Sequence, residues 1–94
     1  MKLAEKFTST GYDFRQMKRK GKWALYEKRR GASVSYEIIE VRDRKETKAT
    51  IGGNAVTFKG GEYYPSTSDF GEFGWAFMEL RNALQEYVTL SGDN

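Results

Sequence analysis

The chain of 94 residues contains no cysteine and no histidine. The absence of cysteine excludes disulfides, thiolate nucleophiles and cysteine-based zinc or iron–sulfur sites. The absence of histidine removes the commonest general base, the commonest transition-metal ligand and the usual pH-sensitive side chain. The remaining acid–base groups show no catalytic pairing. We therefore expect a protein that is not an enzyme, with no catalytic residues, no metal site and no cofactor.

Long apolar runs are also absent. No stretch approaches the roughly 20 apolar residues of a membrane-spanning helix, and residues 1–6 lack the apolar centre of a signal peptide. We expect one small domain over residues 1–94, located in the cytoplasm and without contact to a membrane. Residues 1–10 are expected to form either a flexible arm or, over residues 1–9, a short helix, and residues 91–94 a frayed tail.

Most of the chain before Pro65 alternates apolar and polar residues, which is typical of strands in a sheet with one buried face. Turn residues separate these strands, for example at Gly21, Gly31 and Gly52-Gly53. The apolar positions change register near Ile38, which predicts a β-bulge there. Pro65, the only proline, ends the last of these strands because it has no backbone N–H for the ladder.

An amphipathic pattern predicts one helix from about residues 70–73 to Thr89. The predicted fold is therefore α+β, with an antiparallel β-meander of four to six strands and one C-terminal helix packed on one face. The predicted core includes Leu25, Ile38, Ile51, Phe77, Leu80, Leu84 and Val88.

Trp75 and Met78 lie off the main apolar stripe of this predicted helix. Large apolar side chains outside the buried stripe often mark interfaces, so both are candidates for a protein interface or a helix-to-helix homodimer. The alternative is that the sheet curls around the helix and covers them.

A basic hairpin segment, residues 15–30, is the main candidate binding surface. Its formal charge is +7, whereas residues 62–94 carry −5. The basic residues are Arg15, Lys18, Arg19, Lys20, Lys22, Lys28, Arg29 and Arg30. Tyr26, with Tyr12 and Tyr36, is a candidate platform for base stacking. The alternatives are that these charges only solvate turns and protect strand edges, or that they form a docking face for a protein.

Segments rich in aromatic residues, from Trp23 to Lys28, Tyr36 to Val41, Glu62 to Ser66 and Phe70 to Phe77, resemble small uncharacterised proteins encoded by bacteriophages. This resemblance implies a phage origin, a host-cell cytoplasmic location and a β-meander-plus-helix fold, and brings no assigned activity. The order of elements also resembles single-stranded-DNA-binding proteins of the Whirly and transcriptional coactivator type.

Two function classes follow from these observations. The first is a small, non-enzymatic phage-type binding protein that docks on a host protein. The second is a module that binds single-stranded DNA or RNA through the basic hairpin and the sheet aromatics. The two classes differ in salt dependence, because phosphate contacts weaken steeply with salt and an apolar protein interface does not.

Overall fold

The computed structural model describes the chain except residues 1, 59, 67–69, 73 and 94. The described part contains nine strands and one helix. The strands are β1 (Lys6–Ser9), β2 (Tyr12–Lys20), β3 (Trp23–Arg30), β4 (Ser33–Glu40), β5 (Arg42–Arg44), β6 (Thr47–Ile51), β7 (Asn54–Phe58), β8 (Gly61–Tyr63) and β9 (Gly74–Phe77). The helix is α1 (Leu80–Ser91).

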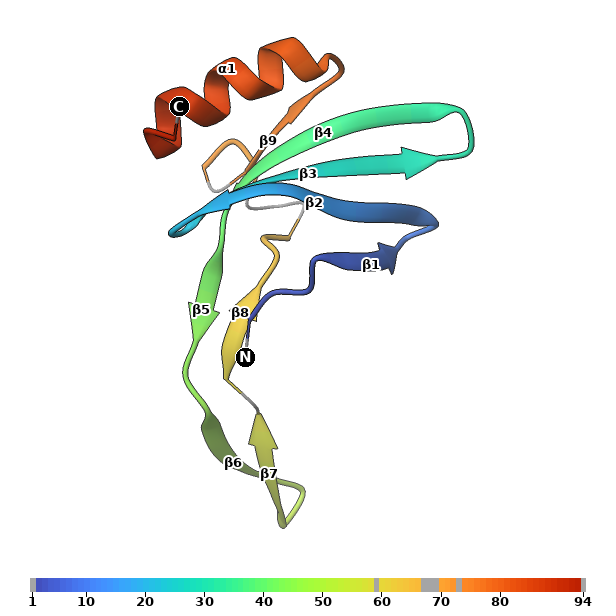
Figure 1. The fold of residues 1–94 in the computed structure, drawn as a ribbon. Coiled ribbons are helices and arrows are strands. Elements are labelled where there is room, and N and C mark those ends of the chain that lie inside the picture. The colour runs from blue at the N-terminus through green and yellow to red at the C-terminus, as the bar shows by residue number, and fades with distance from the viewer. Residues whose placement is uncertain (1, 59, 67–69, 73, 94) are drawn as a thin grey trace.

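The main sheet has five antiparallel strands in the order β1-β2-β3-β4-β9. Its first four strands form a meander, and β9 adds to the remaining edge of β4 (Figure 1). Helix α1 contacts β3, β4 and β9 on one face of this sheet. The predicted α+β fold with an antiparallel sheet and one C-terminal helix is therefore confirmed.

Both faces of the main sheet are buried near its centre, so the expectation of one buried face is wrong. On the helix face, Leu25 and Ile38 pack with Ala83 and Tyr87 of α1. On the opposite face, Tyr26 and Ile39 belong to a second cluster. Neighbouring residues of a strand point to opposite faces, so each strand contributes to both cores.

The predicted β-bulge near Ile38 is also misplaced. Strands β3 and β4 pair without a shift, with Leu25 opposite Ile38 and Ala24 opposite Ile39. The irregularity lies in β2, between Gln16 and Lys18. The apparent register change at Ile38 arises because the next residue, Ile39, is buried in the second core.

The second core is aromatic. The rings of Phe7 and Phe14, opposite each other on β1 and β2, stack at 4.7 Å between centroids. Tyr64 meets the ring of Tyr26 edge-on at 5.2 Å. Leu3 packs against the same cluster. Lys6–Ser9 is therefore a paired edge strand within residues 1–10, where the sequence predicted a flexible arm or a short helix.

The helix begins later than predicted, at Leu80, because Gly74–Phe77 forms β9. Trp75 lies opposite Ile38 and Phe77 opposite Tyr36, so aromatic residues with high strand propensity join the edge of β4. A Cβ on Gly74 would lie 2.8 Å from Phe70 Cε1, so any other residue there would have to displace the Phe70 ring. Phe73, part of the predicted helix start, lies outside the described residues.

The helix ends at Ser91, close to the predicted end. Gly92 has a φ of 72° and donates its N–H to the Val88 carbonyl, which is a left-handed C-cap. The Lys20 ammonium donates to the Gly92 carbonyl at 3.2 Å, near the negative end of the helix dipole. Within the expected tail, the Tyr87 hydroxyl hydrogen-bonds to Asp93; Asn94 lies outside the described residues.

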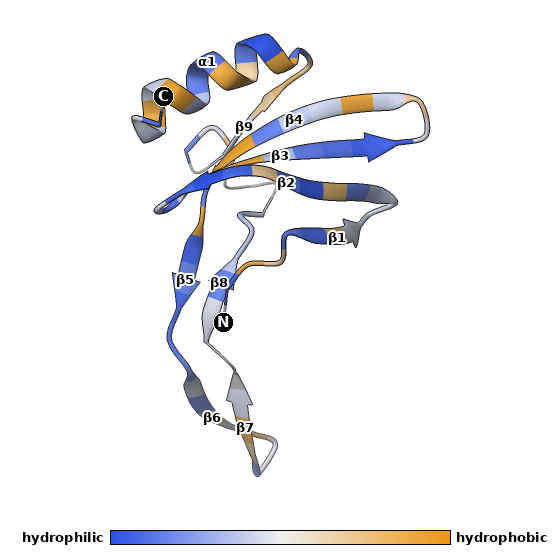
Figure 2. Ribbon diagram, viewed as in Figure 1, coloured by the Kyte–Doolittle hydropathy of each residue, from blue (hydrophilic) through white to orange (hydrophobic). Residues whose placement is uncertain are grey.

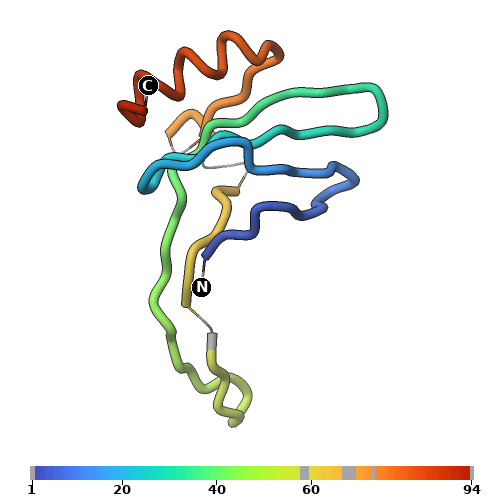
Figure 3. Tube along the Cα trace, in the orientation of Figure 1, coloured from blue at the N-terminus to red at the C-terminus, as the bar shows by residue number. Residues whose placement is uncertain are grey.

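Residues 42–63 leave the main sheet as a long two-stranded projection, which we call the ribbon arm. In Figures 1 and 3 it extends away from the main sheet and from α1, and β6 and β7 lie at its far end. The molecule measures 52 × 32 × 21 Å with a radius of gyration of 15.4 Å, compared with about 12 Å for a compact domain of this length. In the described part of the chain, no helix has the length and apolarity to cross a bilayer.

Candidate binding surfaces

The eight basic residues of the predicted hairpin surface do not form one patch. Because β2 and β3 are antiparallel, Lys20 lies opposite Trp23 at one end of the hairpin, and Arg29 lies opposite Asp13 at the other. Residues that alternate along each strand also point to opposite faces of the sheet. The cations are therefore divided between two ends and two faces.

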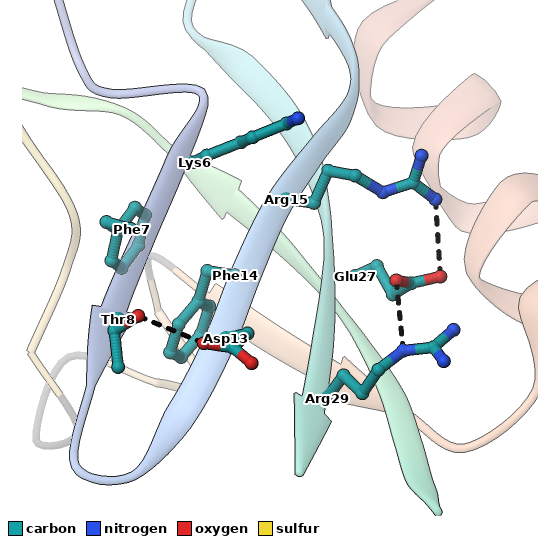
Figure 4. A pocket seen from close by; sticks show the side chains of 8 residues that line it. All are labelled: Lys6, Phe7, Thr8, Asp13, Phe14, Arg15, Glu27 and Arg29. Carbon is teal, nitrogen blue, oxygen red and sulfur yellow. Dashed lines mark hydrogen bonds and ion pairs between the residues drawn. The ribbon is translucent and has the colours of Figure 1, made fainter. Parts of the chain in front are cut away.

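Five of these eight cations form ion pairs. On the face shown in Figure 4, Arg15 and Arg29 both contact the Glu27 carboxylate, at 3.4 and 3.5 Å. An open hollow of about 470 Å³ lies here, lined also by Lys6 and Asp13. Lys22 pairs with Glu40 at 3.0 Å. Because this surface carries charges of both signs, its basic residues attract a polyanion less strongly than an unpaired basic surface would.

Lys28 belongs to a buried polar group. Its ammonium lies 3.4 Å from Glu37, a carboxylate on a residue only 6% exposed, and 4.4 Å from the centroid of the Tyr12 ring. The Tyr64 hydroxyl donates to the other Glu37 oxygen at 2.7 Å. Burial and the Glu37 charge raise the pKa of Tyr64, so this hydroxyl keeps its proton and holds the segment after β8 against β4.

Arg19 connects the main sheet to the root of the ribbon arm. Its guanidinium makes two hydrogen bonds of 2.6 Å to the two oxygens of Glu62 in β8. The backbone N–H of Leu3 also donates to Glu62 at 2.9 Å. These donors stabilise the carboxylate and lower the Glu62 pKa to about 2. Arg19 therefore acts as a structural clamp on the arm.

Tyr26, the predicted stacking platform, is completely buried. Its hydroxyl donates to the Ala4 carbonyl at 2.7 Å and accepts from the Gln16 amide at 3.0 Å. Burial is the main cause of its raised pKa. A base can stack on Tyr26 only if the core opens. Tyr12 and Tyr36 are half-buried.

Trp75 and Met78 were predicted to lie on the helix, but both precede it. Trp75 is a half-buried residue of β9 whose ring lies 6.1 Å from that of Trp23. Met78, in the link to α1, is 79% exposed. The Lys22 ammonium lies 5.6 Å from the Trp23 ring centroid. Trp75 lies next to Trp23 and Lys22, whereas Met78 lies beyond the Phe77–Tyr36 pair, toward the other end of β9. We call this β9 edge of the sheet, with Trp75, Met78, Trp23 and Lys22, the Trp corner.

The ribbon arm was not predicted as a separate feature. Its outer hairpin around Gly52-Gly53 was predicted, but as part of the sheet. The inner ladder ends with Arg44 opposite Gly61, and the outer ladder resumes three residues further along each strand, with Thr47 opposite Phe58. The register is therefore the same in both ladders, so the described strands belong to one ribbon. Between the ladders, Gly60 lies close to the backbone of residues 44–46.

We call residues 44–61 of the ribbon arm the outer arm. Exposed side chains lie on both of its faces. Residues 43–57 are all exposed except Ala49 and Val56, which are half-buried, and Ile51 is 57% exposed. Figure 2 shows β5, nearer the root, in the colours of hydrophilic residues. Within the described residues, β6 and β7 contact mainly each other. A two-stranded ribbon that covers no core is only marginally stable by itself.

Comparisons of the chain with protein-family models, curated proteins and solved structures found no match. The resemblances to phage proteins and to single-stranded-DNA-binding proteins therefore remain predictions.

Proposed function

We propose that this chain is a non-enzymatic binding protein that docks on another macromolecule through its ribbon arm. The observation that carries the proposal is that residues 43–57 project from the main sheet with almost every residue exposed. A fold gains little stability from such a ribbon, whereas a partner can contact both of its faces and both of its edges. The clamp between Arg19 and Glu62 supports this role because it fixes the root from which the arm projects.

The Trp corner supports docking on a protein. If the chain is of phage origin, this partner is a host protein. Its two half-buried tryptophans lie 6.1 Å apart between ring centroids, and Met78, in the link after β9, is exposed. Tryptophan and methionine are enriched at the centres of protein interfaces. A homodimer through the same corner is the alternative for this surface.

The test compares the full chain with an arm-trimmed variant, in which residues 46–59 are replaced by Asn-Gly. Because the ribbon has one register, Lys45 and Gly60 lie opposite each other, and a two-residue turn can connect them. Both proteins are used to capture partners from bacterial lysate, with and without nuclease. Met78→Gln is the matched control for the Trp corner.

The proposal predicts at least one partner that the full chain captures and the arm-trimmed variant does not. Partners that the arm-trimmed variant retains and Met78→Gln loses would assign docking to the Trp corner. If both variants capture the same partners as the full chain, the proposal that the arm is the docking element is wrong.

A further inference from the structure

The net charge of the chain is concentrated in the outer arm. Residues 44–61 contain Arg44, Lys45, Lys48 and Lys59 against Glu46 alone, a formal charge of +3. The net charge of the whole chain is also +3, so the rest of the molecule is formally neutral. The rest is neutral because +5 over residues 1–43 cancels −5 over residues 62–94. The arm is a separate positive projection, which attracts negatively charged partners.

The cations of the outer arm are also less neutralised than those of the main sheet. Among the described residues, no carboxylate lies within ion-pair distance of Arg44, Lys45 or Lys48, whereas most basic residues of β2 and β3 have such a partner. The Arg44 guanidinium lies 4.3 Å from the centroid of the Tyr63 ring, a contact that orients it and keeps its charge. Protein interfaces are depleted of lysine, but phosphate-binding surfaces are rich in lysine and arginine.

The shape of the arm selects among nucleic acids. The major groove of B-form DNA, about 12 Å wide, admits a two-stranded β-ribbon, while the deep, narrow major groove of A-form RNA does not. At the tip, Gly52 and Gly53 have φ angles of 58° and 81° and make a tight turn. The exposed side chains beside this turn, Thr50, Ile51 and Asn54, include the polar and apolar groups that contact base edges and thymine methyls.

We propose that the ribbon arm binds B-form DNA, with the ribbon lying along the major groove and Arg44, Lys45 and Lys48 on the phosphates. This proposal rests on the proposed function, since it names the partner of the same arm. It differs from the predicted single-strand surface, of whose three candidate platforms Tyr26 is buried and Tyr12 and Tyr36 are half-buried. The basic residues of the main sheet are then not the main phosphate contacts.

The experiment measures fluorescence anisotropy of a labelled DNA duplex of about 20 base pairs at salt concentrations from about 50 to 200 mM. Three phosphate contacts predict a slope of log affinity against log salt of about −3, or a loss of about 40-fold over this range. The variant R44Q/K45Q/K48Q removes these contacts. The control K18Q/K20Q/R30Q removes the same charge from basic residues of β2 and β3 for which the structure shows no ion pair.

The proposal predicts that R44Q/K45Q/K48Q binds at least about tenfold more weakly at low salt and with a slope near zero, and that the control retains the wild-type slope. Circular dichroism of each variant confirms that the fold is intact. Absence of wild-type binding at about 50 mM salt, or equal losses in both triple variants, overturns the proposal. Equal binding of an A-form RNA duplex or a single strand of the same length overturns the groove assignment.

These outcomes are separable from those of the proposed function. If DNA does not bind but the full chain captures a nuclease-resistant protein that the arm-trimmed variant loses, the arm is a docking element for an acidic protein. In that case the proposed function stands and the DNA assignment is wrong.

Discussion

At the scale of single residues, the charges of this chain have different roles that depend on their neighbours. Glu62 accepts two hydrogen bonds from Arg19 and one from the backbone of Leu3, and both side chains of the pair are 23% exposed. Glu46, at the irregular part of the arm, is exposed. The two carboxylates belong to the same ribbon, but only Glu62 holds the ribbon to the main sheet.

The Glu62 pair predicts a dependence of stability on acid pH. The pKa of Glu62 is about 2 in the folded chain and 4.5 ordinarily, so its contribution is complete above about pH 4.5 and is lost as the pH falls toward 2. Since the pair is partly exposed, we expect its contribution to the free energy of unfolding to be about 1 kcal/mol. Urea unfolding from pH 7 to 2 should show this loss in wild type and in Glu46→Gln, but not in Glu62→Gln. An unchanged acid dependence in Glu62→Gln would contradict the assignment.

Ile39 and Ile51 allow the same substitution to be compared at a buried and at an exposed position. Ile39 is completely buried in the aromatic core, and Ile51 is 57% exposed at the tip of the arm. Ile39→Ala should lower the free energy of unfolding by about 2–5 kcal/mol, because it removes buried methyl groups and leaves a cavity. Ile51→Ala should change it by less than about 0.5 kcal/mol. Urea denaturation measures both; a large loss for Ile51→Ala would show that the arm packs on the main sheet.

At the scale of elements, β9 and the ribbon arm use the free edges and ends of the meander differently. Strand β9 pairs with β4 along Gly74–Phe77 and carries Trp75 and Phe77 to the helix side. The ribbon arm instead continues from the end of β4 after the buried Val41 and returns near Tyr64. One element therefore completes the sheet, and the other projects from it.

The arm-trimmed variant tests whether the outer arm contributes to the stability of the main sheet. Because β6 and β7 contact mainly each other, removal of residues 46–59 should leave the free energy of unfolding within about 1 kcal/mol of wild type. Thermal unfolding followed by tryptophan fluorescence measures this, since Trp23 and Trp75 lie in the retained part. A Glu62→Gln variant serves as a positive control for damage at the root. Loss of cooperative unfolding in the trimmed variant would mean that the arm is part of the core.

At the scale of the whole molecule, the arm determines the shape. The radius of gyration of 15.4 Å exceeds the value of about 12 Å for a compact domain of this length because the arm extends the longest dimension to 52 Å. This elongation places the positive outer arm away from the acidic residues Glu79 and Glu86 around α1. Positive charge therefore lies both on the hairpin segment, residues 15–30 with +7, and on the arm, residues 44–61 with +3.

Small-angle scattering tests this shape directly. The arm-trimmed variant should have a radius of gyration close to the compact value of about 12 Å, a decrease of about 3 Å from the full chain. A full chain that already scatters as a compact particle would show that the arm folds back on the main sheet in solution. Isoleucine and charge variants of the arm should leave the radius unchanged.

Local sequence determined the elements whose signals lie within a few residues. The turns at Gly21, Gly31 and Gly52-Gly53 occur where glycine permits a positive φ, and the alternating strands between them were predicted. The end of the helix follows from Gly92, whose left-handed conformation other residues rarely adopt. These features depend on backbone conformation and periodicity, which each segment carries independently of its partners.

Tertiary structure alone decided the rest. Gly74–Phe77 has aromatic residues that fit either a helix face or a strand, and the free edge of β4 favours the strand. Arg19 and Lys28 were identified as available cations, but Glu62 and Glu37, carboxylates of other strands, lie beside them. The arm looked like any other hairpin because periodicity does not show whether a ribbon packs on a sheet. Burial and charge pairing depend on segments that only folding brings together, so no local pattern can determine them.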